Sequence, residues 1–309
     1  MTIRLGLGLP QMKQYDIGRD VPAVARAAED MGFESLWVFE RVLFPEPATQ
    51  GLYGVPGLPW PDVYRSVADP LVTLTLAAAA TERARLGSSV LIAPLHVPFQ
   101  LARSLASLDA ASGGRVLAGF GTGWSHDEFA AASVAPFEKR GKVLDELLDV
   151  CAAVWGPDPV AYQGELTTIA PSEVGPKPAR PIPVYLPAMG PRAARRLVDR
   201  ADGWLPVAQG AAQLAEAWTG LRDLAAERGR TRPIEVCVRV NTRYTAKPYE
   251  GAQRPPFTGS AAQIVEDLAA HAVEGVGEFL IDLQGSTRDA EELKDVAEEV
   301  YGLARAAGL

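Results

Sequence analysis

The chain has 309 residues, of which 48% are hydrophobic and 22% are charged, which is ordinary composition for a globular protein with a large core. The formal net charge of −8 argues against general binding to nucleic acid or to an anionic membrane, because both require a basic face. A local basic pocket is still compatible with this charge.

The N-terminus and the two cysteines indicate the compartment. Residues 1–3 lead directly into a glycine-punctuated apolar strand without a charged leader or cleavage site, and no apolar stretch is long enough to span a bilayer. Cys151 and Cys237 lie far apart in apolar runs, so we interpret both as reduced core thiols, and no metal-binding framework is visible. We therefore expect a cytoplasmic protein that holds no metal.

Short apolar runs rich in β-branched residues recur along the chain, and each is followed by a segment of helical period. Eight runs can be counted, over residues 3–9, 35–39, 85–92, 116–120, 182–186, 203–207, 234–240 and 279–283. Because no single glycine-rich turn dominates near the start, this alternation favours a closed (β/α)₈ TIM barrel over an open doubly wound sheet. We predict one domain over residues 1–309.

Three long segments lack a regular pattern. Residues 42–69 are rich in proline, glycine and aromatic side chains and follow the second predicted strand, residues 155–183 precede the fifth, and residues 245–259 follow the seventh. Segments of this length inside a compact domain are usually lids or binding loops. The first and third connect a strand to a helix, so we expect them at the catalytic end of the barrel.

Two glycine-containing turns follow the fourth and fifth predicted strands, Gly119 to Trp124 and Ala188 to Arg192. Glycine allows an oxyanion to approach backbone N–H groups, Pro191 suits a first helical position, and Arg192 adds positive charge at a helix N-terminus. Together the turns predict a phosphate cradle, although glycine in each turn is also explained by turn geometry alone.

Several motifs along the chain carry a family resemblance. They are Leu86 to Pro94, Ala106 to Asp109, Ser112 to Arg115, Gly119 to Trp124, Phe137, Arg140-Gly141, Asp145-Glu146, Gly175 to Pro178 and Ala201 to Trp204. With these motifs the chain resembles the luciferase-like monooxygenase superfamily from Ile3 to about Gly285. Within it, the chain looks most like the branch that uses coenzyme F420, a deazaflavin, rather than FMN.

The resemblance implies a luciferase-like barrel with the cofactor ring across its mouth, a small organic substrate and a homodimer. It also implies a non-prolyl cis peptide bond within Ser89 to Ile92, which we expect between Val90 and Leu91. The residues that match the family's cofactor contacts are Val90, Leu91, Ile92, Gly121, Thr122, Gly123, Ala188, Met189, Gly190, Pro191 and Arg192.

The chain departs from this family at the end of the second strand. Deazaflavin enzymes of the family often carry Asp-His there, with the histidine as proton donor, whereas this chain has Glu40-Arg41. An arginine cannot easily deliver a proton, so Arg41 either binds an anionic or carbonyl group or pairs with Glu40. His96, after the third strand, is then a candidate acid, with a hydrogen-bonded loop histidine as the alternative.

Other polar and aromatic residues are candidates for the substrate pocket. Gln11, just past the first strand, is expected to hydrogen-bond to substrate or ring, while Tyr53, Trp60 and Trp124 are candidates for stacking. Trp37, inside a strand, is expected in the core.

These residues and the resemblance lead us to expect an F420-dependent oxidoreductase that transfers a hydride between the deazaflavin and a small organic substrate. An FMN-dependent monooxygenase on the same fold is the first alternative. A non-catalytic flavin- or deazaflavin-binding protein is the second, because the expected acid is missing from position 41.

Overall fold

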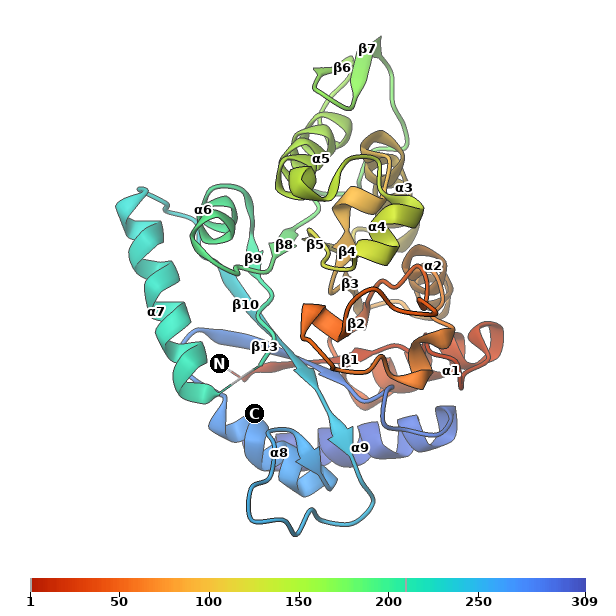
Figure 1. Ribbon diagram of the computed structural model, residues 1–309, viewed down its shortest axis with the longest axis vertical. Coiled ribbons are helices and arrows are strands. Elements are labelled where there is room, and N and C mark those ends of the chain that lie inside the picture. The colour runs from red at the N-terminus through yellow and green to blue at the C-terminus, as the bar shows by residue number, and fades with distance from the viewer. Residues whose placement is uncertain (1, 209) are drawn as a thin grey trace.

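The computed structural model describes residues 2–208 and 210–309. Eight parallel strands close into a barrel surrounded by helices (Figure 1), as predicted. The barrel strands are β1 (Arg4–Gly8), β2 (Ser35–Val38), β3 (Arg85–Ser88), β5 (Val116–Gly121), β8 (Val184–Leu186), β9 (Gly203–Trp204), β10 (Glu235–Asn241) and β13 (Val276–Asp282). Their order is β3-β2-β1-β13-β10-β9-β8-β5, and the pairing of β3 with β5 closes the ring. The short β4 (Leu91–Ile92) extends the β3 wall along β5.

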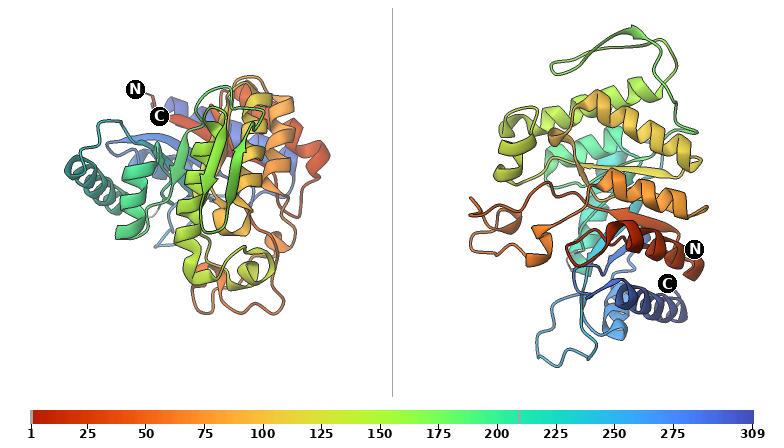
Figure 2. Two further views of the ribbon diagram at one scale, coloured as in Figure 1. Left: turned by 90° about the horizontal axis from the view of Figure 1, so that it is seen from above. Right: turned by 90° about the vertical axis from the view of Figure 1, so that its right-hand side faces the viewer.

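Helices on the outside of the barrel cover the strands (Figures 1 and 2). They are α1 (Ile17–Met31), α2 (Pro70–Ala80), α3 (Pro98–Ser112), α4 (His126–Ala132), α5 (Arg140–Trp155), α6 (Pro191–Arg200), α7 (Ala211–Glu227), α8 (Ala261–Ala270) and α9 (Ala290–Ala306). Local sequence sets several ends, since Asp69 and Ser260 cap the starts of α2 and α8, and a left-handed Gly113 ends α3. No helix within residues 2–208 and 210–309 is long and apolar enough to cross a membrane.

An apolar layer fills the barrel interior. It consists of Trp37, Leu117, Tyr185, Leu205, Cys237 and Leu280, all buried, and Val90 packs against it. Gly203 makes room for this layer, because a Cβ there would lie 2.2 Å from the Tyr185 ring. Both cysteines are free and buried, as predicted.

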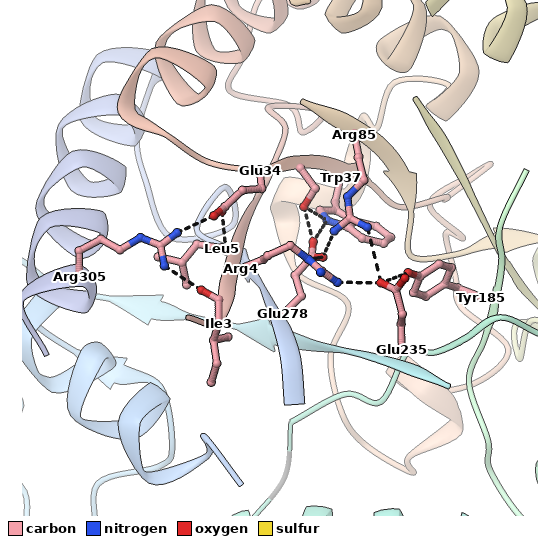
Figure 3. A network of polar contacts seen from close by, with 11 residues as sticks. Ile3, Arg4, Leu5, Glu34, Trp37, Arg85, Tyr185, Glu235, Glu278 and Arg305 are labelled. Atoms are coloured by element: carbon pink, nitrogen blue, oxygen red, sulfur yellow. Dashed lines mark hydrogen bonds and ion pairs between the residues drawn. The ribbon is translucent and has the colours of Figure 1, made fainter. Parts of the chain in front are cut away.

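A polar network lies at the amino-terminal ends of the barrel strands and closes that end of the barrel (Figure 3). The carboxylate of Glu278 is buried and accepts hydrogen bonds from Arg4, Arg85, Ser35 and the Trp37 indole. Glu235 accepts from Arg4 and from the hydroxyl of Tyr185 at 2.9 Å. These side chains come from strands all around the ring, so the network holds the strand starts together, and in barrels of this type that end serves stability.

The three long segments differ in what they form. Residues 42–69 contain only two single 3₁₀ turns, Leu52–Gly54 and Asp62–Arg65, and in the right-hand view of Figure 2 they project on the side away from the chain termini. Residues 245–259 are mostly irregular, although their last two residues form β12 (Thr258–Gly259), which pairs with β11 (Arg243–Tyr244) just before the segment.

The prediction of an irregular segment over residues 155–183 is wrong. It contains an antiparallel hairpin of β6 (Val160–Gln163) and β7 (Thr168–Ser172), which Figure 2 shows beyond α5 at the edge of the molecule. The carboxylate of Glu146 on α5 accepts the N–H groups of Glu165, Leu166 and Thr167, and so it holds the turn. The strands are short and mostly exposed, so they lack the apolar run by which the barrel strands were recognised.

Candidate functional site

The carboxyl ends of the barrel strands form the mouth of the barrel, and three pairs of charged side chains gather there. In each pair, side chains from different segments of the chain meet, and each contains one buried carboxylate. The pairs are Glu40 with His96, Arg41 with Glu128, and Arg239 with Asp282.

Glu40 lies just after β2 and meets His96, which follows the 3₁₀ turn Ala93–Leu95 after β4. The carboxylate of Glu40 is 5% exposed, accepts the Ile92 N–H at 2.5 Å and lies 2.8 Å from Nε2 of His96. Burial disfavours the charged imidazole, but the hydrogen bond and the negative charge of Glu40 outweigh it, so the pKa of His96 is raised above its ordinary value. The pair is therefore able to hold a proton near neutral pH.

Arg41 pairs with Glu128 on α4 and not with Glu40, which corrects one of the two predicted roles. Nη1 of Arg41 lies 2.7 Å from Oε2 of Glu128, and the other carboxylate oxygen accepts the Val42 N–H. Burial raises the pKa of Glu128, and the charge of Arg41 opposes this rise. Nε of Arg41 is buried without a hydrogen-bond partner among the described residues. The pair makes this part of the mouth nearly neutral overall.

The aromatic residues of the mouth pack on Arg41 and on one another. The guanidinium carbon lies 4.7 Å from the centre of the Trp124 ring and 5.4 Å from that of Trp60, in cation–π geometry. The two indoles are 5.2 Å apart, and Tyr53, which is half exposed, lies 5.5 Å from Trp124. The cluster brings the predicted substrate-loop aromatics together and joins residues 42–69 to the turn after β5.

Gln11 does not line the mouth as predicted. Its side chain is buried, its amide nitrogen donates to the carbonyls of Phe39 and Ala68, and its oxygen accepts the Phe39 N–H. All of these contacts are to backbone, so the side chain joins two loops and has no hydrogen left to donate to a substrate.

The expected cis peptide bond lies one residue earlier than predicted, between Ser89 and Val90 instead of Val90 and Leu91. Val90 is partly exposed and lies against Gly121, where a Cβ would come within 2.5 Å of its Cγ2 atom. Leu91 and Ile92 are buried in the core, so of these three predicted cofactor contacts only Val90 offers a side chain to the mouth.

The turn before α6 has the features of an anion site. Gly190 has a φ of 85° and open space around its Cβ position, no side chain caps α6, and Pro191 occupies its first turn. The backbone N–H groups of the first turn of α6 therefore have no side-chain acceptor in the described part of the chain. Arg192 is exposed beside them, and Met189 is 86% exposed. At the neighbouring turn, Thr122 and the left-handed Gly123 are also partly exposed. These donors fit a phosphate group.

Arg239 and Asp282 were not singled out from the sequence. Nη2 of Arg239 lies 2.5 Å from Oδ2 of Asp282, and Nη1 donates to the carbonyl of Ser89. One signal was available, because each is a charged residue near the carboxyl end of a strand that is apolar on either side of it. Within residues 2–208 and 210–309, no three His, Cys, Asp or Glu side chains are grouped so that they could hold a metal ion.

The sequence profile of luciferase-like monooxygenases matches residues 6–253. The chain belongs to this family. An uncharacterized protein of Mycobacterium tuberculosis is 38% identical over 194 residues, which are 62% of this chain and 68% of that protein. An F420-dependent glucose-6-phosphate dehydrogenase of Kineococcus radiotolerans is 28% identical over 180 residues, 58% of this chain and 49% of that protein.

Solved structures of several oxidoreductases share the fold at low sequence identity. An F420-dependent secondary alcohol dehydrogenase in complex with an F420-acetone adduct superposes with a TM-score of 0.76 and 18% identity, over 99% of this chain and 100% of that chain. The oxygenating constituent of the 3,6-diketocamphane monooxygenase of Pseudomonas putida, in complex with FMN, superposes with a TM-score of 0.76 and 16% sequence identity over 98% of each chain. The family match, with the relatives named as F420-dependent enzymes, makes the chain an oxidoreductase.

Proposed function

We propose that the protein is an F420-dependent oxidoreductase that transfers a hydride between the deazaflavin and a small organic substrate. The observation that carries this proposal is the Glu40 and His96 pair, which restores a proton-holding group to the mouth of the barrel. Reduction of a carbonyl or an activated double bond requires a proton as well as a hydride, and this pair can supply the proton. The relatives named as F420-dependent enzymes support the same choice.

The protein's own residues would bind the cofactor and control the proton. When bound, the deazaflavin supplies the hydride chemistry. The free N–H groups of α6 and Arg192 would hold its phosphate, and Val90 would support the ring. Because Nε2 of His96 is hydrogen-bonded to Glu40, Nδ1 is the ring nitrogen that would exchange a proton with the substrate. Glu40 fixes the orientation of the imidazole and favours its charged form.

Calorimetric titration with F420 and with FMN tests the choice of cofactor. We expect F420 to bind and FMN to bind more weakly. Tight FMN binding without any affinity for F420 would contradict the proposal and favour the FMN-dependent monooxygenase, which the FMN complex among the structural neighbours represents. Oxygen consumption with reduced FMN would then identify the monooxygenase directly.

The non-catalytic alternative rested on the missing acid at position 41. His96 removes that reason, because it lies beside Glu40 with a raised pKa.

We further propose a cytoplasmic homodimer. The two free cysteines suit a reducing compartment, and the family resemblance supports the dimer. Light scattering in solution checks the dimer, and a mass near 32.9 kDa would contradict it.

A further inference from the structure

Arg239 crosses the mouth of the barrel. In the strand order, β10 is separated from β3 by three strands on each side, so the contact of Arg239 with Ser89 joins opposite walls. Nε donates to Oδ1 of Asn241 at 2.9 Å, Nη2 donates to Asp282, and the guanidinium carbon lies 5.4 Å from the centre of the Phe39 ring. These contacts hold the guanidinium in one place above the apolar layer of the barrel.

In the ion pair of Arg239 and Asp282, an N–H donor and a carboxylate oxygen have no partner among the described residues. Arg239 has more N–H groups than the contacts with Asn241, Ser89 and Asp282 use. Oδ1 of Asp282 is shielded from solvent and accepts no hydrogen bond from any described residue. Gly8 leaves room for this oxygen, because a Cβ there would lie 2.8 Å from it. A buried carboxylate oxygen without a donor is costly, and such atoms are uncommon in folded proteins.

The chemistry of the pair selects the kind of ligand group. The two charges cancel, so this place suits a neutral polar group, whereas the phosphate has its own donors at the start of α6. A free acceptor beside a free donor matches an N–H next to a C=O. The pyrimidinedione ring that deazaflavins and flavins share has this edge, an imide N–H flanked by carbonyls.

We propose that Asp282 and Arg239 bind the imide edge of the cofactor ring, with Oδ1 of Asp282 accepting the N–H and Arg239 donating to the adjacent carbonyl. The inference rests on the proposed function, because it requires a deazaflavin or flavin in the mouth. It also makes Arg239 a positioning residue, since the same guanidinium holds the carbonyl of Ser89, which precedes Val90 under the expected place of the ring.

Binding of oxidised cofactors in the absence of substrate tests the proposal. We expect Asp282→Asn and Arg239→Met to raise the Kd for F420 and for FMN by about tenfold or more, the usual effect of losing a hydrogen bond to a charged group. Arg85→Met is the matched control, because it also takes an arginine from a buried carboxylate but at the other end of the barrel. It should leave both Kd values within about twofold.

FMN methylated at its imide nitrogen gives the sharpest comparison. The wild-type protein should bind it about tenfold more weakly than FMN, whereas Asp282→Asn should no longer distinguish the two. If Asp282→Asn does not fold, as judged by thermal unfolding, Arg239→Lys provides the second variant, because lysine keeps the charge and loses the planar fork. Arg239→Lys should then raise both Kd values as well.

The outcomes separate this inference from the proposed function. Unchanged cofactor Kd values in the variants overturn the inference alone, and so does an effect confined to the KM of the substrate, which would assign the pair to a substrate N–H and C=O. A wild-type protein that binds neither F420 nor FMN overturns the proposed function together with the inference.

Discussion

Burial lowers the pKa of His96, and the hydrogen bond and charge of Glu40, with a smaller contribution from Asp69, raise it. Replacing Glu40 by Gln removes the negative charge and leaves burial, which lowers the pKa of His96, so we expect this pKa to fall below its ordinary value. NMR titration of the imidazole measures it in both proteins. An unchanged pKa in the Glu40→Gln variant would contradict the assigned pair.

The same pair makes stability depend on pH. Because the folded-state pKa of His96 is raised, its contribution to stability is fully present below the unfolded pKa of about 6.5 and is lost as the pH rises through the folded pKa. Urea unfolding across this window should show a loss of stability in the wild-type protein that is absent from His96→Asn.

Arg41 and Glu128 form a buried ion pair, and removing one of the two residues should lower the free energy of unfolding. Arg41→Met should destabilise the protein by about 3–5 kcal/mol, because it leaves the Glu128 carboxylate buried and unpaired. The pKa of Glu128, already raised, should rise further, so the variant should be relatively more stable at pH 5 than at pH 7. Urea unfolding at both pH values checks this. Arg41→Met/Glu128→Gln is the control and should recover most of the loss.

Among the elements, the hairpin of β6 and β7 depends on α5 for its turn. Glu146→Ala removes the acceptor of three backbone N–H groups, so the amides of Glu165, Leu166 and Thr167 should exchange with solvent much faster. Hydrogen exchange by mass spectrometry measures this. Cofactor binding should not change, because the hairpin lies in a helix-to-strand connection away from the mouth. Full protection in the variant would show that the hairpin is held in another way.

The strands could be predicted because buried parallel strands are continuous apolar runs, and all eight predicted runs overlap barrel strands. The hairpin could not be predicted this way, because its strands are short and mostly exposed, so they form no continuous apolar run. Glu40 and His96 were predicted separately, but their contact depends on the Glu40 carboxylate reaching both Ile92 of β4 and His96 beyond it, which no spacing in the sequence reveals. The same holds for Arg239 and Ser89, which come from opposite walls of the barrel.

For the whole molecule, the buried carboxylate of Glu278 closes the amino-terminal end of the barrel. Glu278→Ala should cost about 3–5 kcal/mol, because it leaves Arg85 partly buried without its main partner and removes the acceptor of Ser35 and Trp37. Chemical denaturation measures the loss, which should leave the Kd for cofactor unchanged in the folded protein. A loss below about 1 kcal/mol would mean that the network contributes little to closing the barrel.

The central claim is that the mouth of this barrel carries out hydride transfer with His96 as the acid. Anaerobic reoxidation of reduced F420 by an enone or nitroalkene probe measures it most directly. We predict that the wild-type protein accelerates this reaction over free cofactor, and that His96→Asn loses about 10²-fold or more while still binding F420. No acceleration by the wild-type protein, or equal rates in the two proteins, would contradict the claim.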